Sequence, residues 1–220
     1  MANVTIDELT LADEPDRWAA YGFDVHDARC SLAGVTLHLS GEQQPGGITG
    51  WSLRELASTD LDGLPTTMSP GSASHDGERA GVHPNGVLAI DHIVAITPDL
   101  DRTIDRLQAA GLDLRRVREE PTPAGAPRQA FFRLGSEILE LAAEPAEVSA
   151  RAGGPQRPAF FWGLALLTAD IEGTAAAFAP HAGQPRAAVQ PGRRIATVKR
   201  SAGLCVPIAL MTPFEKEGQT

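Results

Sequence analysis

The feature that most constrains the fold of this chain is a segment pattern that occurs three times along it. Each copy begins with a short apolar, strand-like run that ends in Thr or Asp, and a helical pattern follows. The three opening runs read IDELTLAD at 6–13, IDHIVAITPDL at 90–100 and FWGLALLTADI at 161–171. Because units of this size bury their apolar faces against one another, the repeat decides the architecture.

The middle copy shows the pattern most clearly. Thr97 is a suitable helix N-cap, Pro98 suits the first helical position, and Asp99 complements the positive end of the helix dipole. Apolar residues then recur at spacings of three and four until a glycine ends the helix: Leu100, Ile104, Leu107 and Gly111. By the same reasoning we expect Thr168 to cap the helix of the third copy and Asp13 to cap that of the first.

Three further strand-like runs follow each helix. They lie at 112–117, 128–135 and 137–143 in the middle copy, at 186–190, 193–200 and 205–211 in the third, and at 23–26, 28–34 and 35–41 in the first. The order strand, helix, strand, strand, strand predicts an α+β fold of repeated βαβββ modules with mostly antiparallel sheets.

The predicted domain organisation follows from these copies. A shortened module occupies 1–56, a central module 87–145 and a C-terminal module 159–213. The intervening segments are a linker or long loop at 57–86, rich in Gly, Pro, Ser and Asp, a connector at 146–158, and a polar tail at 214–220. Residues 48–56 read as a strand, as a helical turn, or as the start of a degenerate fourth module.

Charge and composition exclude several classes of partner. The net charge of −9 at pH 7 argues against nucleic acid and against anionic membrane surfaces, both of which attract basic proteins. No run of about 18 apolar residues predicts a membrane span, and the acidic N-terminus does not resemble a signal peptide. Cys30 and Cys205 lie far apart in the sequence, so we expect two reduced thiols in a cytoplasmic protein.

The modules resemble the vicinal-oxygen-chelate superfamily of glyoxalases, bleomycin-resistance proteins and extradiol dioxygenases. The resemblance is carried by IDHIV at 90–94, TPDL at 97–100, AGL at 110–112, LG at 134–135 and ILEL at 138–141. It is strongest over 87–143, weaker over 159–213, and spaced more tightly over 4–41. The chain is also similar to uncharacterised glyoxalase-like proteins of actinobacteria, a likeness that implies no named reaction.

The resemblance implies cupped sheets made by two paired modules, with metal ligands on the first and fourth strands of each module. By position these ligands are His92 and Glu140 in the central module, and Glu8 and His38 in the first. The corresponding positions of the third module have no ligating side chain: Gly163 and Ala209.

Which modules pair therefore decides the chemistry that the resemblance implies. If the central and third modules pair, only His92 and Glu140 face the cup, and two protein ligands are too few for a tight site. If the first and central modules pair, Glu8, His38, His92 and Glu140 converge on a divalent ion such as Zn, Ni, Mn or Fe with open positions for substrate oxygens. Glu140 then also becomes the catalytic proton shuttle.

Strand alternation gives an independent reading of these residues. His92 is expected to share a face with Ile90 and Val94, and Glu140 also lies on an apolar face, so each polar side chain needs a partner. That partner is either a metal ion or a direct contact between His92 and Glu140. Glu8 and His38 alternate with threonine and serine, which is also typical of a solvent-exposed sheet face.

Two arginines and the module count complete the predictions. Arg193 and Arg194 begin a strand after a Pro-Gly turn, where they either clamp a carboxylate or phosphate of a substrate or are simply solvated. An odd number of modules leaves a sheet edge open and predicts a homodimer. Three functions stay open. The first is a metal-dependent lyase, isomerase or dioxygenase, and the second is a metal-free protein that binds or sequesters a small molecule, as bleomycin-resistance proteins do. The third is a scaffold whose modules only mediate oligomer contacts.

Overall fold

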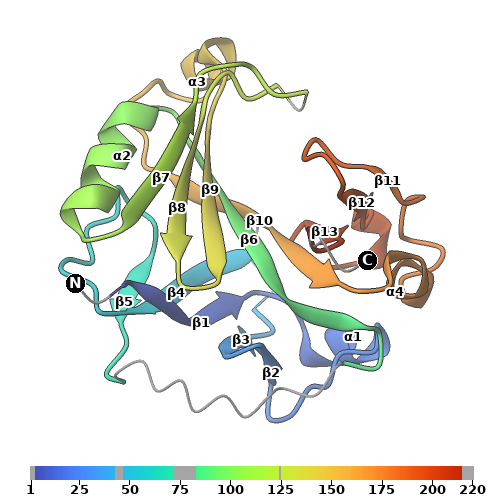
Figure 1. Cartoon of the computed structure of the whole chain (residues 1–220). Coiled ribbons are helices and arrows are strands. Elements are labelled where there is room, and N and C mark those ends of the chain that lie inside the picture. Colours follow the sequence, from blue (N-terminus) through green and yellow to red (C-terminus); the bar gives the residue numbers. More distant parts are fainter. Residues whose placement is uncertain (1–2, 43–46, 72–82, 124, 215–220) are drawn as a thin grey trace, which may run out of the picture.

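The computed structural model describes residues 3–42, 47–71, 83–123 and 125–214, which form two β-sheets around one hydrophobic core (Figure 1). The N-terminal part contains β1 (Thr5–Leu11), α1 (Pro15–Ala20), β2 (Arg29–Leu32), β3 (Val35–Leu39), β4 (Ile48–Arg54) and β5 (Thr66–Met68). The middle part contains β6 (Val87–Thr97), α2 (Leu100–Ala109), β7 (Asp113–Arg118), β8 (Gln129–Leu134), β9 (Glu137–Ala143) and α3 (Ala146–Arg151). The C-terminal part contains β10 (Phe160–Thr168), α4 (Ile171–Ala177), β11 (Arg186–Ala187), β12 (Arg194–Thr197), the short 3-10 helix η1 (Arg200–Ala202) and β13 (Ile208–Met211).

The larger sheet has eight strands in the order β11-β12-β13-β10-β6-β9-β8-β7. In each of its two modules the first strand runs parallel to the last, β6 to β9 and β10 to β13. The two modules join where β6 and β10 run antiparallel along the middle of the sheet. The predicted α+β class with βαβββ modules and mostly antiparallel sheets is confirmed, and the central module pairs with the third.

The smaller sheet repeats this plan in shortened form, in the order β2-β3-β1-β4-β5. β1 is parallel to β3 and antiparallel to β4, while β4 is parallel to β5. β4 is therefore placed against β1 as β10 is against β6, and residues 48–68 occupy the position of a fourth, shortened module. The first module consequently does not pair with the central one, and that alternative is wrong.

Two predicted segment assignments in the N-terminal part are corrected. The strand expected at 23–26 is reduced to a single bridge between His26 and Arg29, so the first module lacks one strand. The predicted linker at 57–86 begins with ordered structure that includes β5, because Leu61 and Leu64 are buried in the core. Its residues 72–82, like 215–220 of the predicted tail, lie outside the described residues.

The same β-bulge interrupts the first strand of both sheets. Against β4, the pairing of β1 skips Asp7 between Ile6 and Glu8. Against β10, the pairing of β6 skips Asp91 in the same way, so that Ile90 and His92 face neighbouring residues of β10. Neighbouring residues of a strand point to opposite faces, so the bulge places Ile90 and His92 on opposite faces. The predicted shared face of these two residues is wrong for this reason.

Helices α2 and α4 both begin two residues later than predicted. The N-caps are Asp99 and Asp170. Each carboxylate accepts a hydrogen bond, 3.0 Å long, from the backbone N–H of the residue three positions later in the chain. The threonines expected to cap instead bond to a second threonine inside the helix. The pairs and their Oγ1–Oγ1 distances are Thr97–Thr103 at 2.7 Å and Thr168–Thr174 at 2.5 Å.

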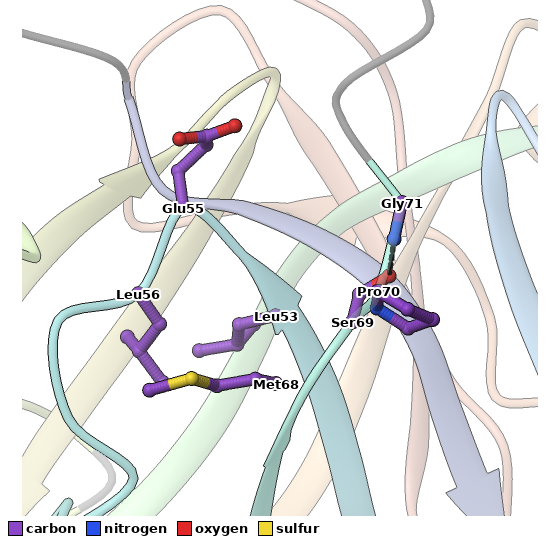
Figure 2. A pocket seen from close by; sticks show the side chains of 7 residues that line it. All are labelled: Leu53, Glu55, Leu56, Met68, Ser69, Pro70 and Gly71. Carbon is purple, nitrogen blue, oxygen red and sulfur yellow. Dashed lines mark hydrogen bonds between the residues drawn. The ribbon is translucent and has the colours of Figure 1, made fainter.

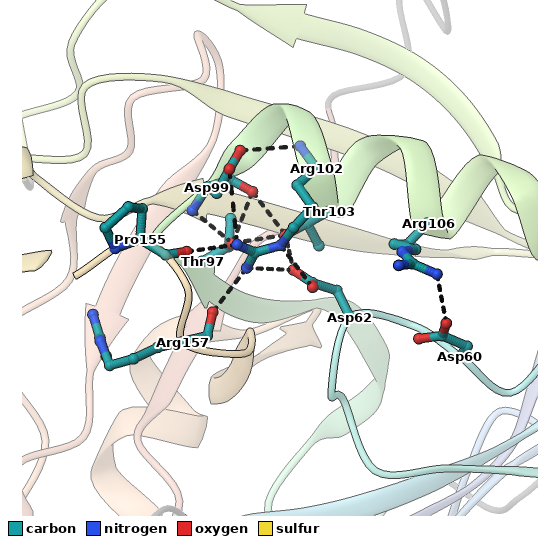
Figure 3. Close-up of polar contacts among 9 residues, drawn as sticks. All are labelled: Asp60, Asp62, Thr97, Asp99, Arg102, Thr103, Arg106, Pro155 and Arg157. Carbon is teal, nitrogen blue, oxygen red and sulfur yellow. Dashed lines mark hydrogen bonds and ion pairs between the residues drawn. The ribbon is translucent and has the colours of Figure 1, made fainter. Parts of the chain in front are cut away.

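Buried polar contacts hold the N-terminal part against the rest of the chain. Asp13, expected to cap α1, instead accepts the backbone N–H of Cys205 at 2.5 Å. Arg102 at the start of α2 donates to both carboxylate oxygens of Asp62, at 2.9 and 3.0 Å, and to the carbonyl oxygens of Pro155 and Arg157 (Figure 3). One guanidinium therefore joins the turn before β5, helix α2 and the connector before β10. The connector itself contains α3.

Candidate functional site

The face of the eight-stranded sheet that points away from α2 carries the predicted site residues, and we call it the inner face. On β6 it bears His92, Val94 and Ile96, which are half-buried, whereas Ile93 and Ala95 on the other face are fully buried. In Figure 1 the β7–β9 and β11–β13 halves of the sheet lie on either side of the central strands β6 and β10. On the central strand β6, the inner face is therefore the one whose side chains are partly accessible to solvent.

A line of polar contacts runs across the inner face. The guanidinium of Arg193 holds both oxygens of Asp91, with Nη2 to Oδ1 at 2.6 Å and Nη1 to Oδ2 at 3.2 Å. Asp91 Oδ2 is 2.8 Å from His92 Nδ1, and His92 Nε2 is 3.7 Å from Glu140 Oε2. Glu140 Oε1 accepts a hydrogen bond from the side-chain amide of Gln129. These five residues come from four strands or their immediate ends.

The bulge explains why Asp91 and His92, although adjacent in sequence, interact side by side. Burial alone would raise the pKa of Asp91, but the hydrogen bonds from His92 and Arg193 outweigh it and hold that pKa below its ordinary value. A charged Asp91 accepts the proton on His92 Nδ1, which fixes the ring and turns Nε2 toward Glu140. The side chains of His92 and Glu140 are 15% and 18% exposed, which leaves both within reach of a ligand.

The predicted arginine clamp is not formed. The Arg193 side chain is only 3% exposed, and besides Asp91 its Nε donates to the carbonyl oxygen of Thr212 at 2.7 Å. Phe214 covers the guanidinium, with its ring centre 4.5 Å away. Arg194 points elsewhere and pairs with Glu172 at the start of α4. Arg193 thus positions Asp91 rather than offering its charge to a substrate.

Glu8 and His38 lie on the smaller sheet, in a register that matches His92 and Glu140. β1 sets Thr10 against His38, just as β6 sets Val94 against Glu140. The two side chains approach within 3.9 Å, and Glu8 is also paired with Arg29. The predicted four-ligand site is therefore not assembled: in the described ranges, no three His, Cys, Asp or Glu side chains form a group suited to a metal ion.

The donors on the inner face do not fit a tightly held divalent metal ion. His92 Nε2 and the Glu140 carboxylate are two donors, and the Asp91 carboxylate is already occupied by Arg193 and His92. In the third module the equivalent places are Gly163 and Ala209, and a Cβ at Gly163 would lie 2.8 Å from the carbonyl oxygen of Pro207. That glycine lets two backbones approach closely, and a ligating side chain cannot replace it without moving them.

Two members of the polar line escaped the sequence prediction. Simple alternation would place Asp91 on the face opposite His92, yet the Ile-Asp pair repeated at 6–7 and 90–91 marks the bulge in both copies. Gln129 lies on β8 diagonally across from Glu140, with Phe131 directly opposite that residue. The even spacing of Gln129 and Phe131 in an apolar strand was the available signal.

A separate hollow of about 270 Å³ lies beside the ends of β4 and β5 (Figure 2). Its lining residues are Leu53, Glu55, Leu56, Met68, Ser69, Pro70 and Gly71. Glu55 is the only ionisable side chain among them, so this hollow lacks the acid–base pairing of the inner face.

Comparison with known proteins now assigns the family. Residues 89–197 match the profile of the Glyoxalase/Bleomycin resistance protein/Dioxygenase superfamily. The chain belongs to this superfamily. The matched segment runs from β6 to β12, which is most of the eight-stranded sheet, and it includes all five residues of the polar line. The five-stranded sheet lies outside the match, and no curated protein matches the chain in sequence.

Solved structures of glyoxalase-superfamily fold resemble the chain at low sequence identity. Methylmalonyl-CoA epimerase from Mycobacterium tuberculosis superposes with a TM-score of 0.50 at 20% identity, over 62% of this chain and 95% of the epimerase. Methylmalonyl-CoA epimerase from Streptomyces coelicolor, in complex with 2-nitronate-propionyl-CoA, has a TM-score of 0.47 at 22% identity, over 60% of this chain and 99% of that one. At such identities the likeness concerns the fold alone.

Proposed function

We propose that this glyoxalase-superfamily protein binds a small organic molecule on the inner face of its eight-stranded sheet, without a resident divalent metal ion. The observation that carries the proposal is the oriented His92–Glu140 pair, 3.7 Å apart, on a face whose other two ligand positions are Gly163 and Ala209. His92 and Glu140 would provide directional hydrogen bonds, and Val94, Ile96 and Phe131 would provide apolar contact.

Metal content tests this function directly. We expect protein purified without chelators to contain Zn, Ni, Mn and Fe well below one equivalent, and EDTA to leave its melting temperature unchanged, because two donors hold such ions weakly. The matched variants are His92→Ala and His38→Ala, which remove equivalent histidines from the two sheets. One equivalent of metal in the wild type that is lost in His92→Ala but kept in His38→Ala would contradict the proposal.

A proton-transfer enzyme is the second candidate, favoured by the Asp91–His92–Glu140 line. Asp91 orients the His92 ring so that Nε2 can accept a proton from a bound carbon or oxygen acid, and the Glu140 carboxylate next to it stabilises the resulting imidazolium. Glu140, which the sequence predicts to be catalytic, is the alternative acceptor for the same substrate proton.

Hydrogen exchange measures this activity without knowledge of the product. Small ketoacids and thioesters incubated in D2O with the protein should lose their α-hydrogen NMR signals faster than with His92→Gln, by about a hundredfold or more. Equal exchange rates with wild type and variant across the set would leave binding as the function and reject catalysis.

Homodimerisation stays a prediction of the sequence. Its physical basis was an unpaired third module, and the pairing of β1 with β4 within the chain removes that particular argument. No helix in the described ranges is long and apolar enough to cross a membrane.

A further inference from the structure

Two arginines share the inner face at its β7 edge. Cross-strand pairing sets Arg116 opposite Phe131 and Arg118 opposite Gln129. Directly opposed residues of an antiparallel pair lie on the same face. Since Gln129 bonds to Glu140 on that face, both arginines belong to the surface that holds the polar line.

Both guanidinium groups are only weakly neutralised, as is Arg133 on the same face of β8, which donates to the carbonyl oxygen of Gly135 at 3.4 Å. Arg116 is exposed and forms no hydrogen bond or ion pair within the described residues. Arg118 is 26% exposed and lies 3.8 Å from Glu120, whose side chain is 75% exposed and well hydrated. By contrast Arg128 nearby is held by two carboxylates, Glu119 and Asp101. A chain of net charge −9 thus presents a locally positive edge on the inner face.

The distance from this edge to His92 sets the length of a ligand that would use both. β7 is three strands away from β6, which is about 14 Å at the usual strand spacing. One row of paired residues crosses the sheet from this edge: Arg116 is paired with Phe131, Phe131 with Glu140, and Glu140 with Val94. Phe131 and Val94 are the apolar side chains of this row.

Charge also sets the direction of such a ligand. The Glu140 carboxylate beside His92 disfavours an anionic group at the centre of the sheet, while Arg116 and Arg118 favour it at the edge. Across β6, His92 is paired with Ala165 of β10, which is in turn paired with Ala209 of β13, and neither side chain carries a charge.

We propose, on the basis of the function inferred above, that the ligand is an elongated organic acid. Its carboxylate binds Arg116 and Arg118, its apolar middle covers Phe131, and its uncharged polar end reaches His92. Arg116 and Arg118 are then the residues that select for the acid.

The test compares 6-(4-hydroxyphenyl)hexanoate with 6-(4-hydroxyphenyl)hexan-1-ol. Both carry a phenol as the uncharged polar end, and they differ in the charged end only. Titration followed by calorimetry and by the NMR signals of the His92 ring should show the carboxylate binding about tenfold more tightly than the alcohol in wild-type protein, less so at high salt. Arg116→Gln/Arg118→Gln should bind both equally, at the affinity of the alcohol. Arg106→Gln/Arg200→Gln changes the net charge by the same amount at exposed sites outside the inner face and should retain the preference.

The outcomes separate this inference from the proposed function. If both probes shift the His92 signals with equal affinity in wild type, or if the double variant keeps the preference, acid selection is overturned while small-molecule binding stands. If neither probe shifts the His92 signals, both fail. In each case circular dichroism of the double variant, whose substitutions are on an exposed edge, confirms that it is folded.

Discussion

At the scale of single residues, His83 shows how a side chain becomes fixed in one protonation state. The ring is 4% exposed, its Nδ1 accepts the backbone N–H of Asp24 at 3.0 Å, and its Nε2 faces the carbonyl oxygen of Ser31 at 3.0 Å. Only the neutral ring with its proton on Nε2 satisfies both contacts. Burial lowers the pKa of His83 from the ordinary value of 6.5, although Ser31 and Asp24 oppose the shift.

The free energy of unfolding should therefore depend on His83 below pH 6.5. The unfolded chain takes up a proton there while the folded chain resists it, so stability is full above the unfolded pKa and falls as the pH drops toward the folded pKa. The slope for one proton is at most about 1.4 kcal/mol per pH unit. Urea denaturation at several pH values, compared with His83→Gln, measures it; identical pH profiles for the two proteins would rule this out.

Residue identities alone allowed His92 and Glu140 to be placed on one surface, since polar side chains in apolar strands stand out. They did not allow the surroundings of these residues to be placed. Asp91 depends on a bulge, which adds one residue to one strand and leaves almost no trace in composition. The burial of His83 depends on contacts with residues more than fifty positions away along the chain.

At the scale of elements, α2 and α4 start with the same arrangement. In each, a threonine at the end of a strand bonds to a threonine one turn into the helix, and an aspartate two residues after the first threonine is the N-cap. The sequences TPDLDRT at 97–103 and TADIEGT at 168–174 show this spacing directly. The repeat is visible in the sequence, but each copy offers two candidate caps two residues apart, Thr97 or Asp99 and Thr168 or Asp170, and only the structure distinguishes them.

Replacing a cap should cost more than replacing a neighbouring acid. Asp99→Ala and Asp170→Ala are expected to lower the free energy of unfolding by about 1 kcal/mol each, because a backbone N–H loses its acceptor. Asp101→Ala removes an exposed carboxylate from the same turn of α2 and is the matched control, with a loss of a few tenths of a kcal/mol. Chemical denaturation compares the three, and equal losses for Asp99 and Asp101 would contradict the assignment.

At the scale of the whole molecule, the chain consists of two module pairs of unequal length. Strand boundaries of the central module followed from its periodicity, but the partner of each module did not, since pairing depends on contacts between segments far apart in sequence. A strand or a fourth module at 48–56 was among the readings of the sequence, but the pattern did not choose between them because this module comprises only β4 and β5. One hydrophobic core containing residues of both sheets then makes the smaller pair part of the same folded body.

The position of Phe214 has a practical consequence for anyone producing this protein. Its ring lies on the guanidinium that holds Asp91, so the C-terminal end of the described chain is attached directly beneath the polar line. A purification tag or fusion partner that displaces the Phe214 ring would uncover the Arg193 guanidinium. Attachment at the N-terminal end, which enters the separate five-stranded sheet through β1, keeps such additions away from His92.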